Sequence, residues 1–144
     1  MTMHELNTSD DLYTRLGGEA VIHAFVNHLY DYMESTASVE HIRSMHSADL
    51  SLARERLFMF LSGMLGGPPI YMDKFGPPRL RRKHLHFDIG DEERDQWLSC
   101  AQHAINLLDI DGHLCEELMR NLTVMANHLR NKNSDSIPCI SKTA

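Results

Sequence analysis

The spacing of apolar residues along the chain predicts helices in most of its length. Residues with large apolar side chains recur every three or four positions, which is the period of an α-helix with one buried face. The segments with this spacing are 21–33, 57–65, 97–108 and 114–129. No segment alternates apolar and polar residues as a half-exposed strand does. The sequence therefore predicts an all-α fold, without internal repeats.

Short polar residues indicate where two further helices begin. Ser38 is expected to cap a shorter helical segment that carries Ile42 and Met45. Ser47 or Asp49 offers a start for the helix that follows. These residue types accept hydrogen bonds from the first free backbone N–H groups of a helix, so they favour helix starts.

The segment from residue 66 to residue 90 lacks a helical period. Its four prolines, which are Pro68, Pro69, Pro77 and Pro78, forbid a long helix before Arg79. We expect an irregular loop here, and a loop of this length in a compact domain usually serves a function. The next long helix is predicted from Asp91, because three successive acidic residues suit the positive end of a helix dipole.

Length and composition predict one globular domain in a reducing compartment. The chain has 144 residues, 42% hydrophobic and 24% charged, which argues against two domains and against disorder. We expect the domain at 10–131, with an N-terminal extension at 1–9 and a polar, mobile tail at 132–144. Neither a membrane span nor a signal peptide is visible, and the three cysteines are widely spaced, so we expect a cytoplasmic protein. The net charge of −6 disfavours nucleic acid as a partner.

The candidate chemistry lies in the irregular segment, where four basic residues precede a histidine. Arg79, Arg81, Arg82 and Lys83 stand immediately before His84. Neutral imidazole is a strong axial ligand for haem iron, and nearby cations can pair with haem propionates. Three interpretations of these residues remain open: a haem site, a basic patch for a phosphate-bearing partner, and a non-haem metal site formed by His84 and His86 with His46.

A dense set of residues then resembles one known family, from about residue 12 to residue 130. The matching residues are Leu16-Gly17-Gly18, Tyr30, Phe60-Leu61, Gly66-Gly67-Pro68, Tyr71, Pro78-Arg79-Leu80-Arg81, His84, Phe87, Ile89, Glu93-Arg94-Asp95 and Trp97-Leu98. In this order and spacing the chain resembles a group II truncated haemoglobin. The resemblance implies a two-over-two helical globin around one haem b, with His84 as the proximal iron ligand.

The resemblance also implies which residues face the bound ligand. Tyr30 and Trp97 match distal residues of the family, and their hydroxyl and indole N–H are hydrogen-bond donors. His46 matches a variable position at which a histidine can donate to the ligand, titrate near neutral pH or bind the iron. Ala53 and Leu57 match the remaining distal positions and are apolar. Tyr30 or His46 is the expected sixth iron ligand when no diatomic ligand is bound.

The propionate contacts are implied with two departures from the family pattern. Tyr71, Arg79 and Lys83 are the candidates for these contacts. Lys83 stands where we expect arginine, so the charge is kept but the two-pronged guanidinium is lost, and Pro77 stands where we expect histidine. Only one histidine binds the proximal face of a globin haem, so His86 is interpreted as a surface or structural residue.

The resulting functional hypothesis is a haem globin that reversibly binds oxygen, carbon monoxide or nitric oxide at ferrous iron. Three distal donors suit long retention of a polar ligand, which favours ligand chemistry or sensing over bulk oxygen transport. Detoxification of nitric oxide or peroxide, with a dioxygenase-like or peroxidase activity and an unidentified reductase, is the expected use. The oligomeric state is expected to be a monomer or a weak dimer.

Overall fold

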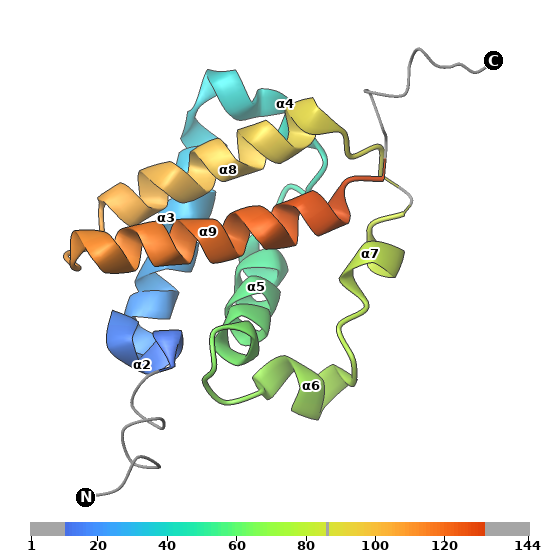
Figure 1. Ribbon diagram of the computed structural model, residues 1–144. Helices are drawn as coiled ribbons and strands as arrows, with labels where there is room; N and C mark the ends of the chain where they lie inside the picture. Colours follow the sequence, from blue (N-terminus) through green and yellow to red (C-terminus); the bar gives the residue numbers. More distant parts are fainter. Residues whose placement is uncertain (1–10, 86, 132–144) are drawn as a thin grey trace, which may run out of the picture.

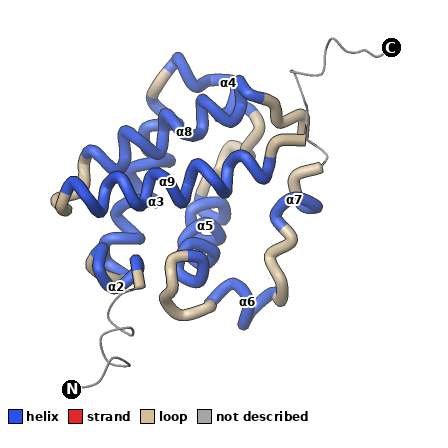
Figure 2. The backbone as a smooth tube through the Cα atoms, viewed as in Figure 1, coloured by secondary structure: helices blue, strands red, loops and turns tan. Residues whose placement is uncertain are grey.

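The computed structural model describes residues 11–85 and 87–131, and this part of the chain is helical with no strand (Figures 1 and 2). Its elements are α2 (Leu12–Leu16), α3 (Glu19–Ser35), the 3-10 helix η1 (Ala37–Val39), α4 (Glu40–Ser44), α5 (Ser51–Met64), α6 (Ile70–Phe75), α7 (Leu80–Lys83), α8 (Asp91–Asn106) and α9 (Gly112–Leu129). The all-α expectation is confirmed. The expected extension at 1–9, the tail at 132–144 and His86 lie outside the described residues.

The four long helices form two packed pairs. Helix α8 runs beside α9, and α3 packs against both α8 and α5 (Figure 1). Helices α6 and α7 follow α5 and lie at one side of this assembly, where α6 contacts α5 and α7 contacts α9. No helix in the described residues is long and apolar enough to cross a membrane.

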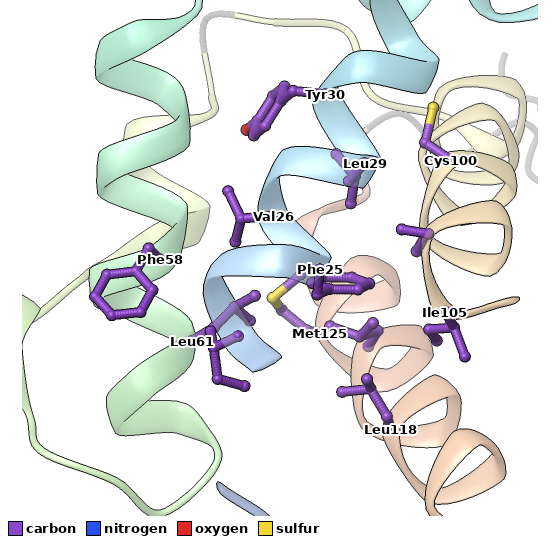
Figure 3. Close-up of a cluster of buried hydrophobic side chains, with 14 of the residues drawn as sticks. Phe25, Val26, Leu29, Tyr30, Phe58, Leu61, Cys100, Ile105, Leu118 and Met125 are labelled. Carbon is purple, nitrogen blue, oxygen red and sulfur yellow. The ribbon is translucent and has the colours of Figure 1, made fainter. Parts of the chain in front are cut away.

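The hydrophobic core lies between these pairs. Figure 3 shows Phe25 and Leu29 of α3 facing Ile105 of α8 and Leu118 of α9, with Leu61 of α5 beside them. Burying each such side chain stabilises the fold by roughly 1.5–3 kcal/mol relative to leaving it exposed. The apolar spacing read from the sequence therefore identifies the buried faces of α3, α8 and α9 correctly.

Two expected helix starts are wrong in detail. Ser38 lies inside the 3-10 turn η1 and caps nothing, because the chain bends into helix from Thr36 onward. Helix α5 starts at Ser51, with Leu50 in the capping position. Asp49 acts one residue earlier, since its Oδ1 accepts hydrogen bonds from the Ser51 N–H at 2.9 Å and from the Ser51 hydroxyl at 2.8 Å.

The segment from residue 66 to residue 90 contains two short helices, which the expected irregular loop missed. Pro69 stands at the start of α6, where a proline costs no hydrogen bond, and its carbonyl accepts from the Asp73 N–H at 3.0 Å. Gly76 ends α6 with a φ of 80°, in the left-handed region that glycine adopts without strain. The prolines therefore allow no long helix, as expected, but they delimit the short helix α6 that the irregular pattern did not predict.

Helix α8 begins as the acidic run predicts. Glu93 reaches back with its carboxylate and accepts a hydrogen bond from the Gly90 N–H at 2.7 Å. This bond satisfies a backbone donor that the helix leaves free, and it places negative charge at the positive end of the dipole. It also fixes the point at which the chain leaves the His84 segment and enters the core.

Candidate functional site

A cavity of about 560 Å³ lies between α5, α7 and α9, within the ordinary size range of cofactor sites. Its apolar wall is formed by Phe60, Met64, Leu80, Val124, Met125 and Leu129. Polar and basic side chains, namely Arg79, Arg82, Asn121 and His128, complete the lining. The cavity thus offers an apolar interior with cationic groups at its boundary, which suits a flat apolar cofactor that carries carboxylates.

His84 follows directly after α7, whose Leu80 lines this cavity. Neither His84 nor the distal candidates Tyr30, Trp97 and His46 are among the lining residues. Its Nδ1 lies 2.7 Å from the carbonyl oxygen of Leu80. A carbonyl oxygen can only accept, so Nδ1 must carry the proton in the neutral ring and Nε2 must present its lone pair. The imidazole is half-buried, with its tautomer and orientation held in the way that ligating histidines are held in metal sites.

Two of the three propionate candidates lie together. Tyr71 on α6 is buried, and its hydroxyl accepts a hydrogen bond from the Lys83 ammonium at 3.0 Å. The same ammonium lies 5.5 Å from the centre of the Tyr71 ring. Arg79 is exposed, and its φ of 48° is the one left-handed non-glycine conformation in the described residues. Tyr71 and Lys83 therefore form a preformed polar pair next to His84, with Arg79 at the cavity boundary.

Tyr30 is a buried donor without a partner. The residue is only 5% exposed, and its hydroxyl makes no hydrogen bond within the part of the chain that the structure describes. Figure 3 shows the ring leaving α3 towards α5. Burial raises the pKa of this hydroxyl to about 12, so it keeps its proton at neutral pH. The ring is buried but the hydroxyl oxygen is not fully enclosed, so it is open to an acceptor that a ligand supplies.

His46 lies after α4 and faces the Tyr30 ring edge-on. Its Nδ1 is 2.9 Å from the carbonyl oxygen of Ile42, so in the neutral ring Nδ1 carries the proton and Nε2 is an acceptor. Burial is the main cause that lowers the pKa of His46, and the charges of Arg43 and His84 act in the same direction. The hydrogen bond to the Ile42 carbonyl acts in the opposite direction, but the net lowering of the pKa favours the neutral form of His46.

Trp97 on α8 and Leu57 on α5 are both partly buried and pack against the core. The indole N–H of Trp97 has no hydrogen-bond acceptor among residues 11–85 and 87–131. Trp97 is thus a second candidate donor without a protein partner, while Leu57 contributes apolar surface.

Sequence reasoning missed Arg54 as a residue near the site. From α5 it donates to the Asp31 carboxylate at 2.8 Å and to the Asn27 side-chain oxygen at 3.0 Å, both on α3. Its guanidinium lies 5.8 Å from the centre of the Tyr30 ring. It therefore joins α3 to α5 around Tyr30. Its place one helical turn before Leu57 is the only sequence signal for this role.

These features fit a haem. An imidazole with an available Nε2, an apolar cavity lined by the neighbouring Leu80, cationic side chains on that lining and two donors without a protein acceptor are the chemistry that a haem and its ligand need. Among the described residues, no three histidine, cysteine, aspartate or glutamate side chains lie together as a bare metal site would require.

Comparison with known proteins agrees with this chemistry. The model of the bacterial-like globin family matches residues 11–131. The chain is 34% identical over 115 residues to the group 2 truncated hemoglobin YjbI of Bacillus subtilis, covering 79% of this chain and 87% of that protein.

Solved structures give the same answer for the fold. A group II 2-on-2 hemoglobin from Agrobacterium tumefaciens superposes with a TM-score of 0.81 at 35% identity, covering 85% of this chain and 95% of that one. A cold-adapted truncated hemoglobin from Pseudoalteromonas haloplanktis gives a TM-score of 0.82 at 36% identity, covering 85% and 99%. The chain therefore belongs to the bacterial-like globin family, as a group II truncated haemoglobin with the two-over-two fold that binds haem b and diatomic gases such as oxygen.

Proposed function

We propose that His84 holds the haem iron through Nε2, and that Tyr30 and Trp97 hold the diatomic ligand on the opposite face. The observation that carries the proximal assignment is the 2.7 Å hydrogen bond between His84 Nδ1 and the Leu80 carbonyl. This bond commits Nδ1 as a donor and leaves the basic Nε2 for the metal. Lys83 and Tyr71, with Arg79, supply the polar groups for the propionates.

When bound, haem supplies a ferrous iron that can take a diatomic ligand. The protein supplies everything that selects and retains that ligand. Tyr30 and Trp97 present donors for a ligand atom that carries partial negative charge, and the surrounding apolar side chains make each such hydrogen bond stronger than in water. Leu57 and its apolar neighbours exclude water from the same space.

His46 plays a different part from the two donors. While it is neutral, its only N–H is used by the Ile42 carbonyl, so it offers the ligand a lone pair and no proton. It becomes a donor to the ligand only when it is protonated. With no ligand present, the same Nε2 lone pair or the Tyr30 hydroxyl is the candidate for the sixth iron position.

Retention by two donors suits ligand chemistry or sensing better than oxygen delivery, which requires ready release. We therefore propose a cytoplasmic protein that acts on nitric oxide or peroxide, or senses a diatomic gas, and that receives electrons from a reductase. The burial of Tyr30 supports this proposal, because a dry pocket favours slow dissociation of a polar ligand.

Replacement of the proximal candidates tests the assignment. His84→Ala should abolish stable haem retention, whereas His86→Ala should leave the haem spectrum intact. An intense Soret band that survives treatment with a metal chelator is expected for wild type. Retention of the wild-type spectrum by His84→Ala, or its loss only in His86→Ala, would show that another residue binds the iron.

A further inference from the structure

The element that presents His84 is too short to hold its own position. Helix α7 is a single turn of four residues, from Leu80 to Lys83, and a helix of this length does not persist without outside contacts. The chain before it carries the left-handed Arg79, and the chain after it turns back over Phe87, whose N–H donates to the His84 carbonyl at 3.0 Å. The position of the imidazole must therefore be set by contacts from other elements.

Asn131, the second residue after the end of α9, makes three hydrogen bonds to the loop from His84 to Ile89. Its Nδ2 donates to the His84 carbonyl oxygen at 3.0 Å, across 47 positions of sequence. Its Oδ1 accepts from the Ile89 N–H at 3.0 Å, and its backbone N–H donates to the Ile89 carbonyl at 2.9 Å. The partners define the amide orientation, because a carbonyl can only accept and an N–H can only donate. One side chain thus bridges both ends of the loop.

The C-terminal end of α9, which precedes Asn131, is itself held against α8. Arg130, the residue before Asn131, pairs with Asp91 at 2.5 Å. This contact joins the C-terminal end of α9 to the first turn of α8. A group held in this way keeps its geometry and can transmit it to whatever it binds.

We propose that Asn131 is a positioning residue for the proximal ligand, which fixes the loop from His84 to Ile89 and thereby the distance and tilt of the imidazole at the iron. The proposal rests on the proposed role of His84 as iron ligand. Asn131 acts through the His84 carbonyl and does not itself touch the metal or the diatomic ligand.

Without the Asn131 side-chain amide, the His84 carbonyl loses its hydrogen bond to the chain that follows α9. The hydrogen bond between Lys83 and Tyr71 remains and still holds the residue before His84. The loop from His84 to Ile89 therefore keeps its approximate position but samples more orientations. The distance and tilt of the imidazole relative to the iron then vary more, so the iron–histidine bond is weaker and haem dissociates more readily. The loss of a neutral hydrogen bond predicts haem dissociation that is roughly two- to tenfold faster.

The first experiment compares Asn131→Ala with Asn127→Ala in the haem-loaded protein. Asn127 is one helical turn earlier on α9, and its side chain accepts from Arg94 without touching the loop, so it is a matched control. We expect Asn131→Ala to speed haem transfer to an acceptor globin and to shift and broaden the iron–histidine stretching band of the ferrous protein. Asn127→Ala should match wild type in both measurements.

A second variant separates the two ends of the bridge. Asn131→Asp keeps an oxygen to accept from the Ile89 N–H but has no N–H for the His84 carbonyl. In haem-free protein, hydrogen exchange at the Ile89 amide should be fast in Asn131→Ala and remain slow in Asn131→Asp. In haem-loaded protein, both variants should show the altered iron–histidine band. Exchange at Ile89 tests the bridge without any reference to haem.

A third comparison removes the covalent link between the proximal imidazole and the loop. In His84→Gly supplied with free imidazole, the proximal ligand has no covalent link to the chain. Adding Asn131→Ala to this background should leave the iron–imidazole band unchanged, because Asn131 acts through the backbone of residue 84. A shift of equal size in both backgrounds would overturn the proposal in favour of a general loosening of the pocket.

The remaining outcomes are also decisive. Wild-type haem loss and a wild-type iron–histidine band in Asn131→Ala would overturn the positioning role, even if Ile89 exchange became fast. If His84→Ala kept its haem, the proposed ligand would be wrong, whereas fast Ile89 exchange in haem-free Asn131→Ala would still show that the bridge exists. Failure of the ligand assignment is therefore distinguishable from failure of the bridge.

Discussion

The ring of His46 stands edge-on to the ring of Tyr30, with centroids 5.8 Å apart and an angle of 76° between the planes. This relationship puts a titratable group beside a hydroxyl that has no protein acceptor. Neutral His46 uses its N–H on the Ile42 carbonyl, so in the proposed site it can donate to a ligand only after protonation, whereas the Tyr30 hydroxyl keeps its proton at all ordinary pH values.

Removal of the distal donors should shorten oxygen retention. Tyr30→Phe and Trp97→Phe each remove one donor while keeping an aromatic ring, and a neutral hydrogen bond contributes roughly 0.5–1.5 kcal/mol, more in a dry site. We expect the oxygen dissociation rate to rise several-fold in each variant, measured by stopped flow. Carbon monoxide is less polar, so its dissociation should change less. Equal effects on both gases would indicate a steric origin.

Oxygen retention should depend on pH through His46. Burial lowers the pKa of His46 from its ordinary 6.5, so the ring is neutral at pH 7 and gains a second N–H only as the pH falls through the lowered value. Oxygen dissociation should therefore slow between pH 7 and pH 5 in wild type and stay flat in His46→Leu. The same pH dependence in both proteins would assign it to another group.

The free energy of unfolding should decrease as the pH falls, because of the same histidine, His46. A histidine whose pKa is lower in the folded than in the unfolded state stabilises the fold above the unfolded pKa, near 6.5, and this contribution is lost as the pH falls through the folded pKa. The free energy of unfolding of wild type should drop in this window, measured by denaturant titration. His46→Leu should lose less, whereas an equal loss would exclude His46 as the cause.

The polar pair beside His84 should have a small, salt-sensitive effect on haem retention. Lys83→Ala and Tyr71→Phe each break the 3.0 Å hydrogen bond, and exposed ion pairs contribute roughly 0–1 kcal/mol, which is at most about a fivefold change in rate. For Lys83→Ala the increase in haem loss should shrink in high salt, while for Tyr71→Phe it should not. A salt-independent change in Lys83→Ala would contradict an ionic propionate contact.

Core substitutions should be far more costly than surface ones. Phe25 is 1% exposed at the centre of the cluster in Figure 3, so Phe25→Ala should lower the free energy of unfolding by about 3–5 kcal/mol. Leu107 is 54% exposed at the end of α8, and Leu107→Ala should change it by no more than about 0.5 kcal/mol. Denaturant titration of the two variants makes the comparison, and similar losses would contradict the burial seen here.

Local patterns were sufficient wherever a helix has one buried face. Apolar spacing identified α3, α8 and α9, and the acidic run beginning at Asp91 located the start of α8, because capping and amphipathic periodicity act within a few residues. They were insufficient for α6. Pro69 there begins a helix, and a proline at a helix start looks the same in sequence as one that breaks a helix.

The sequence by itself determined that the protein is helical, and the resemblance proposes His84, Tyr30, Trp97 and His46 as residues of the haem site. Only the tertiary structure decided what each can do. The Ile42 carbonyl makes neutral His46 an acceptor, although donation had been expected from its residue type alone. The hydrogen bond from Asn131 to the His84 carbonyl joins two residues that are 47 positions apart in the sequence. No local sequence pattern encodes this contact, because it depends on where the end of α9 lies relative to α7.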